Sequence, residues 1–229
     1  MTKGGMVQVK ELINSSNGIL FDFNGTLSND EEVLEQAYDV ALVQLGLNGL
    51  NAGEYASLLG HSDPDIARVL LDARGEGNRI EEFLSVLAET YPAASISADC
   101  LKSDSVELLK WLLRNDKRVG IVTGTLRSMI VPVLANHGLL EILNCLVTIE
   151  DVKAGKPDPE GFALGAKLLG LETEEVLALE DSNAGFAAAN SLGMRVVGIG
   201  NAIETSRLAA HYPTMVDLAA AVVDHEDSW

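Results

Sequence analysis

The stretch that decides the fold runs Ile19-Leu20-Phe21-Asp22-Phe23-Asn24-Gly25-Thr26-Leu27. Its apolar beginning predicts a buried strand, which ends at the Asp22 carboxylate and is followed by the chain-breaking pair Asn24-Gly25. Open parallel sheets place functional side chains at such a position, where a strand ends and a loop begins. We therefore expect Asp22 to lie in a site. Asn24 stands where a second carboxylate would be expected for proton transfer, and its amide cannot titrate.

Strands and helices alternate along most of the chain, but only after a long helical interruption. Between residues 29 and 100 the apolar residues recur at helical spacing, and no strand is predicted there. Later strands are expected at 118–122, 143–148, 176–179 and 195–199, and the helices beside them at 106–113, 132–138, 160–169 and 183–192. This alternation is typical of a parallel sheet covered by helices on both faces. We predict an α/β core of residues 1–28 and 101–229 and an inserted helical domain of residues 29–100.

Two helix starts in and beside the insertion match known capping patterns. Ser28, with Glu31 three residues later, matches a capping box. Asp63 followed by Pro64 matches an N-cap and a first helical position. We therefore expect the side chains of Ser28 and Asp63 to cap the helices that follow them.

The composition indicates a folded globular protein with a strongly acidic surface. Of the 229 residues 47% are apolar, and 34 acids against 16 bases give a net charge of −18. Such a surface repels nucleic acid and anionic lipid, so we expect neither as a partner. Cys100 and Cys145 lack the spacing of a metal site or a disulfide framework, which predicts free, buried thiols. No apolar run reaches the ~18 residues of a membrane span and residues 1–17 hold no signal-peptide core, so we expect a cytoplasmic protein.

Four polar clusters follow the predicted strands. They are Asp22-Phe23-Asn24-Gly25-Thr26, Thr123-Gly124-Thr125, Gly155-Lys156-Pro157 and Glu180-Asp181-Ser182-Asn183. A single acid after a strand is usually a helix cap. Four such clusters instead predict one shared site, because the carboxyl ends of parallel strands meet at one edge of the sheet.

In this order, the four clusters resemble the haloacid dehalogenase superfamily of phosphotransferases. The motifs Asp-x-x-Gly-Thr, strand-Thr, Gly-Lys-Pro-x-Pro and Glu-Asp-Ser-x-x-Gly together cover nearly the whole chain. The chain looks most like the branch with a helical cap inserted after the first motif, which holds phosphoglycolate phosphatases and β-phosphoglucomutase. The resemblance implies a Rossmann-like parallel sheet with a cap domain.

The resemblance also implies phosphoryl transfer through a covalent aspartyl-phosphate on Asp22, which splits one difficult step into two. Thr123 and Lys156 match the residues that hold the transferring phosphoryl group and neutralise its charge. Four further residues would line the phosphate-binding loops: Gly25, Thr26, Gly124 and Thr125.

A magnesium ion is the cofactor that this resemblance implies. Its protein ligands would be the Asp22 carboxylate, the main-chain carbonyl of Asn24 and the Asp181 carboxylate, with Glu180 orienting the metal-bound waters. Glu180 and Asp181 could instead cap the following helix, a role that is compatible with metal binding.

Asn24 departs from the family pattern, because phosphatases and mutases of this branch carry an aspartate there that protonates the leaving oxygen and activates water. The loss of such a proton donor typically costs ~10²–10⁴ in rate. Three interpretations remain open. His61, which lies in the loop where caps of this branch meet their substrate and is a candidate substrate-binding residue, could supply the proton. Otherwise the substrate could have a good leaving group, or the protein could be nearly inactive.

The insertion narrows the choice of reaction and substrate. It holds no lysine between Lys10 and Lys102, which excludes a Schiff-base phosphonate hydrolase, and the Glu180-Asp181 pair argues against metal-free dehalogenation. Residues 29–100 contain fourteen acids and three arginines, so this segment would repel polyanions. We expect hydrolysis of a small phosphate monoester, with a β-phosphoglucomutase-like mutase or a catalytically weak phosphate-binding protein as the alternatives. The oligomeric state, monomer or dimer, stays open.

Overall fold

A parallel sheet of six strands forms the centre of the computed structural model, which describes residues 3–203 and 206–223. The strand order is β3-β2-β1-β4-β5-β6 and every neighbouring pair is parallel. The strands are β1 (Gly18–Phe21), β2 (Arg118–Val122), β3 (Cys145–Val147), β4 (Val176–Glu180), β5 (Arg195–Ile199) and β6 (Ala210–Tyr212). The predicted α/β class is confirmed.

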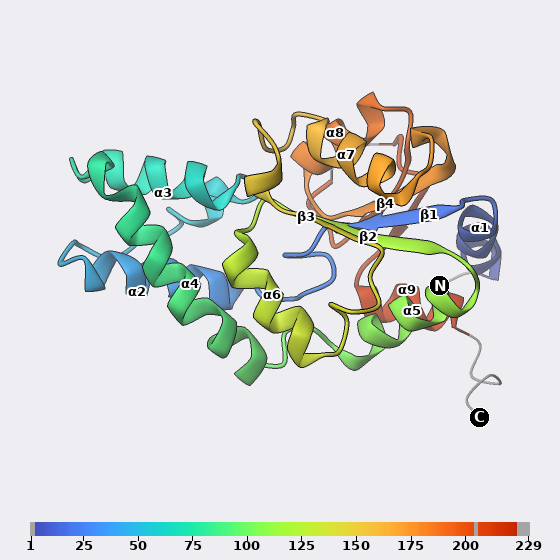
Figure 1. Ribbon diagram of the computed structural model, residues 1–229, viewed down its shortest axis with the longest axis horizontal. Coiled ribbons are helices and arrows are strands. Elements are labelled where there is room, and N and C mark those ends of the chain that lie inside the picture. Colours follow the sequence, from blue (N-terminus) through green and yellow to red (C-terminus); the bar gives the residue numbers. More distant parts are fainter. Residues whose placement is uncertain (1–2, 204–205, 224–229) are drawn as a thin grey trace.

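Helices cover both faces of the sheet (Figure 1). One face packs against α1 (Lys3–Asn14), α5 (Ser103–Arg114), α6 (Arg127–Asn136) and α9 (Met215–Val222), and the other against α7 (Glu160–Leu169) and α8 (Asn183–Ser191). In β1, Ile19 and Phe21 join the first apolar cluster and Leu20 joins the second, as the alternation of a strand requires. Because both faces are covered, β1 is apolar at every position after Gly18.

Three α-helices form a layer of their own beyond one end of the sheet (Figure 1). They are α2 (Glu31–Gln44), α3 (Asp63–Asp72) and α4 (Ile80–Ser97), with 3-10 turns at Ala56–Leu58 and Gly77–Arg79; two further 3-10 turns lie in the core, at Ile149–Asp151 and Thr173–Glu175. The Tyr38 ring lies 5.3 Å from the Tyr55 ring and 5.8 Å from the Phe83 ring, centroid to centroid, and so centres this layer. Helix α4 also packs against α6, which joins the helical layer to the core.

Both predicted helix caps are wrong. Helix α2 begins at Glu31 after Asp30, and no side-chain hydrogen bond caps its first turn. The N-cap of α3 is Ser62, not Asp63. The Asp63 carboxylate instead accepts hydrogen bonds from the Tyr38 hydroxyl (2.6 Å) and the Leu126 amide (2.9 Å). Two buried donors brought together by tertiary packing outcompete a local cap for this acceptor.

Three elements went unpredicted: helices α1 and α9 and strand β6. Strand β6 is only three residues long, and α9 is apolar on almost every side, so neither shows a clear period. The two cysteines are free and buried, as expected. Among the described residues, no helix combines the length and the apolar character needed to cross a membrane.

Arg74 links several segments of the helical layer through hydrogen bonds. Its guanidinium donates two hydrogen bonds of 2.9 Å to the Glu54 carboxylate and three more to the carbonyls of Asn48, Gly49 and Leu70. The hydrogen bonds from Arg74 lower the pKa of Glu54 from 4.5 to about 2. By contrast, Arg68 is exposed, and Asp65 is the one residue that it pairs with in the described part of the chain.

Replacing Arg74 with alanine should lower the free energy of unfolding by about 2–3 kcal/mol, because several bonds to a charged donor are lost together. Urea unfolding measures this, with Arg68→Ala as the control, expected within about 0.5 kcal/mol of the parent. The pKa of Glu54 is depressed in the folded state, so the contribution is complete above pH 4.5 and fades as the pH falls toward 2. Equal losses in the two variants would contradict this role of Arg74.

Candidate active site

The carboxyl ends of β1, β2 and β4 bring three of the predicted clusters together. The strand register pairs Phe21 with Ile121 on one side and with Leu179 on the other, and the Asp22 amide donates to the Leu179 carbonyl at 2.9 Å. Asp22 therefore stands level with Glu180, the last residue of β4. Strands β2 and β3 lie on one side of β1, and β4 to β6 lie on its other side. The strand order therefore reverses at β1, and open α/β sheets bind ligands at the carboxyl end of such a reversal.

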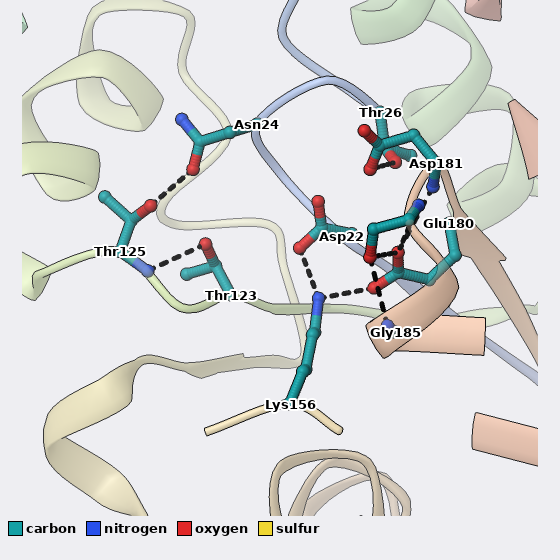
Figure 2. A network of polar contacts seen from close by, with 10 residues as sticks. Asp22, Asn24, Thr26, Thr123, Thr125, Lys156, Glu180, Asp181 and Gly185 are labelled. Atoms are coloured by element: carbon teal, nitrogen blue, oxygen red, sulfur yellow. Dashed lines mark hydrogen bonds and ion pairs between the residues drawn. The ribbon is translucent and has the colours of Figure 1, made fainter. Parts of the chain in front are cut away.

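Lys156 links these strand ends. Its Nζ contacts Asp22 Oδ1 and also lies 2.5 Å from Glu180 Oε1 (Figure 2). Burial alone would lower the pKa of Lys156, but the two carboxylates outweigh it and raise the pKa above its usual value. Lys156 is thus a fixed, buried positive charge directed at Asp22.

Three carboxylates surround a space that fits a hard cation. Asp22, Glu180 and Asp181 each offer an oxygen, and these oxygens all lie within 4.8 Å of one another. Burial raises the pKa of Asp22 to about 7 against the opposing effect of Lys156, and burial together with Asp22 and Glu180 raises that of Asp181. An all-oxygen set of this kind suits Mg²⁺, whose charge would offset the repulsion.

Two motif glycines make room for these carboxylates. Gly25 has φ +75°, and a Cβ there would lie 2.3 Å from Asp181 Oδ2. In α8, a Cβ on Gly185 would lie 1.9 Å from the Glu180 carboxyl group. The spacing Glu-Asp-Ser-x-x-Gly thus has a steric reason, since only glycine lets α8 approach β4 this closely.

The predicted threonines lie at the same site but differ in what they contact. Thr26 Oγ1 donates to Asp181 Oδ1 at 3.2 Å, so it orients a carboxylate. Thr123 Oγ1 accepts from the Thr125 amide at 3.1 Å, which fixes the turn through Gly124 (Figure 2). The Thr123 hydroxyl hydrogen remains able to donate to a phosphoryl oxygen in the cavity that Thr123 lines.

The Asn24 side chain is held away from Asp22 by three partners. Its Oδ1 accepts from the Thr125 hydroxyl, as Figure 2 shows, and its Nδ2 donates to Asp30 Oδ2 at 2.8 Å and to the Tyr91 hydroxyl oxygen at 3.3 Å. Tyr91 also donates to Asp30. Burial raises the pKa of Asp30 to about 6, against the effect of these hydrogen bonds. Sequence reasoning missed Asp30 and Tyr91, because nothing in their local sequence indicates this contact.

A cavity of about 360 Å³ lies between the strand ends and the helical layer. Asp22, Thr123 and Lys156 line its inner end, and His61 lines it from the loop before α3, with Nδ1 3.0 Å from the Leu58 carbonyl oxygen. The structure thus brings His61 and the motif residues to one cavity. Seven further lining residues were not among the predicted site residues: Glu31, Leu34, Tyr55, Leu59, Ser62, Asp63 and Ile66.

The family model of the haloacid dehalogenase-like hydrolases matches residues 19–199, from β1 to the end of β5. The chain belongs to this family. The match covers all four motifs and the helical layer, so it confirms the expected family and enzyme class.

Two known phosphatases and one solved structure resemble this chain over most of its length. It is 27% identical over 201 residues to validoxylamine A 7'-phosphate phosphatase of Streptomyces hygroscopicus subsp. limoneus, covering 87% of this chain and 92% of the relative. It is 28% identical over 204 residues to phosphoglycolate phosphatase of Pectobacterium atrosepticum, covering 85% and 87%. The crystal structure of CbbY from Rhodobacter sphaeroides in complex with phosphate matches with a TM-score of 0.77 at 22% identity, covering 90% and 99%, and shows the shared fold.

Proposed function

We propose that this chain hydrolyses a small phosphate monoester through an aspartyl-phosphate on Asp22. The observation that carries the proposal is the convergence of Asp22, Thr123, Lys156 and Asp181 at the carboxyl ends of neighbouring strands. The relatives named as phosphatases support the same reaction class.

In the proposed first step, an Asp22 oxygen attacks phosphorus and the bond to the leaving oxygen breaks. Lys156 and Thr123 hold the phosphoryl oxygens and neutralise the charge that develops on them. The leaving oxygen takes up a proton, and in the second step water attacks phosphorus, which frees inorganic phosphate and the Asp22 carboxylate.

Magnesium is the proposed cofactor. The residues that would hold it are Asp22, Asp181 and the main-chain carbonyl of Asn24, with Glu180 orienting the bound waters. When bound, it supplies positive charge that screens the carboxylates from the approaching phosphate.

Proton transfer is the step that Asn24 alters. Its amide is bound by Thr125 and Asp30 and does not titrate, so it cannot give a proton to the leaving oxygen; that proton comes from water, from His61 or not at all. A phosphomutase needs repeated proton exchange with sugar hydroxyls, which disfavours that alternative. Because the Asn24 amide cannot donate the proton, the second candidate function is that of a phosphate-binding protein with weak turnover.

Residues 29–100 form the proposed cap over the α/β core of residues 1–28 and 101–229. The Asp63 amide donates to the Gly124 carbonyl at 3.1 Å, and the Asp63 carboxylate accepts from the Leu126 amide. These two hydrogen bonds join the start of α3 in the cap to the loop that follows β2 in the core. A closed cap of this kind would exclude water during transfer to Asp22.

Metal removal tests the proposal directly. The chain should hydrolyse p-nitrophenyl phosphate with release of inorganic phosphate, lose at least about 10²-fold of that activity in excess chelator, and regain it when Mg²⁺ is added back. Circular dichroism before and after chelation serves as the control for folding. Turnover that persists unchanged in chelator would contradict the metal-dependent mechanism.

A further inference from the structure

The cavity has two chemically different ends. The inner end holds the catalytic groups Asp22, Thr123 and Lys156. The part of the lining that comes from the helical layer is called here the outer end; it combines the apolar side chains of Leu34, Tyr55, Leu59 and Ile66 with the carboxylate of Glu31. A substrate whose phosphate lies at Asp22 therefore directs its leaving group toward Leu34, Tyr55 and Glu31.

Positive charge is scarce around this cavity. Among its described lining residues the only lysine or arginine is Lys156, and both Asp22 and Glu180 already bind it. The ionisable groups that the helical layer contributes to the lining are Glu31, Tyr55, His61 and Asp63. The Asp63 carboxylate is occupied by Tyr38 and Leu126, and the His61 ring lies against the Leu58 carbonyl.

Glu31 is the acid at the outer end that is left to meet a substrate. It is exposed in the first turn of α2, and its carboxylate makes no hydrogen bond or ion pair to any part of the chain that the structure describes. A second anion on the substrate, such as a carboxylate or another phosphate, would face this charge, and Lys156 is the one lysine or arginine among the described residues that line this cavity. A hydroxyl or an ammonium group could donate to it.

We infer that the substrate is a phosphate monoester whose leaving group carries hydroxyl or ammonium groups and no second anion, with Glu31 as the specificity-determining residue. This rests on the proposed function. The CH faces of a polyol or amino-polyol chain pack on Leu34, Tyr55 and Ile66, while its donors reach Glu31. Such a substrate arises from phosphorylation of a polyol or amino alcohol, and its product is the free alcohol.

Three esters with the same two-carbon skeleton isolate the charge: phosphoglycolate, 2-hydroxyethyl phosphate and phosphoethanolamine. At pH 8 with Mg²⁺, kcat/KM for phosphoglycolate should be at least about tenfold below the values for the other two esters. Phosphoglycolate as the best of the three would overturn the inference while leaving the phosphatase intact. If none of the three esters nor p-nitrophenyl phosphate is hydrolysed, the proposed function itself fails.

Charge reversal identifies the residue. Glu31→Lys should raise the ratio of kcat/KM for phosphoglycolate over 2-hydroxyethyl phosphate by about tenfold or more, because an ammonium then meets the carboxylate. Glu32→Lys is the matched control, since Glu32 is exposed in the same helical turn and does not line the cavity. Its ratio should stay within about twofold of the parent.

A ratio of kcat/KM values for two substrates on the same variant does not depend on how much of that variant is folded, because the enzyme concentration divides out. Glu31→Gln keeps the size of the side chain and should reduce the preference for phosphoethanolamine over 2-hydroxyethyl phosphate. An equal shift of the ratio in Glu31→Lys and Glu32→Lys would assign the effect to overall charge and refute the role of Glu31. An unchanged ratio in Glu31→Lys and Glu31→Gln would refute it as well.

Discussion

Asp22→Asn should lower kcat for p-nitrophenyl phosphate by ~10³-fold or more, because an amide cannot attack phosphorus. The substitution preserves the size of the side chain and leaves Lys156 paired with Glu180, at 2.5 Å. It also removes a carboxylate whose pKa burial raises to about 7, so the variant should fold at least as well as the parent. Steady-state kinetics with Mg²⁺ measure the loss.

Asp104→Asn is the matched control for this substitution. Asp104 is exposed in the first turn of α5, outside the active-site cavity, and the same chemical change there should leave kcat within about twofold of the parent. Thermal unfolding confirms that both variants are folded. A kcat of Asp22→Asn close to that of the parent would exclude Asp22 as the nucleophile.

Asn24→Asp should raise kcat by ~10²-fold for alkyl phosphates, because it restores a group that can donate a proton to the leaving oxygen. The introduced carboxyl group would lie against Asp30, which now accepts from Asn24 Nδ2 at 2.8 Å. Two carboxyl groups at this distance share one proton, so a proton stays available near neutral pH. The gain should be smaller for p-nitrophenyl phosphate, whose leaving group needs little acid assistance.

Asn24→Ala separates proton donation from release of the anchored amide. This variant loses the contacts to Thr125 and Asp30 but gains no acid, so its kcat should not rise. Kinetics with an alkyl and an aryl phosphate compare the parent with both variants. A similar gain in Asn24→Ala and Asn24→Asp would show that the amide acts by blocking the site, and no gain in either would show that proton transfer does not limit turnover.

The core of the fold was predictable because its strands are buried on both faces and bounded by loops with clear chemistry. Asp22 and Thr123 each follow an apolar run, and Glu180 ends one, so a parallel sheet places all three at one edge. The order of the strands in the sheet could not be predicted, because the spacing of apolar residues indicates which side chains are buried and not which strands pair with each other. The short strand β6 and the mostly apolar helix α9 were not predicted, because their apolar residues show no clear period.

The sequence by itself determined the α/β class, the helical insertion and the motif residues, because these depend on local periodicity and on spacing along the chain. Only the tertiary structure decided which partners the polar side chains have. Asp63 contacts Tyr38 and Leu126 in place of a helix end, and Asn24 contacts Asp30 and Thr125. Such partners lie up to about a hundred residues away, and packing brings them together, since buried donors and acceptors must be paired wherever the chain places them.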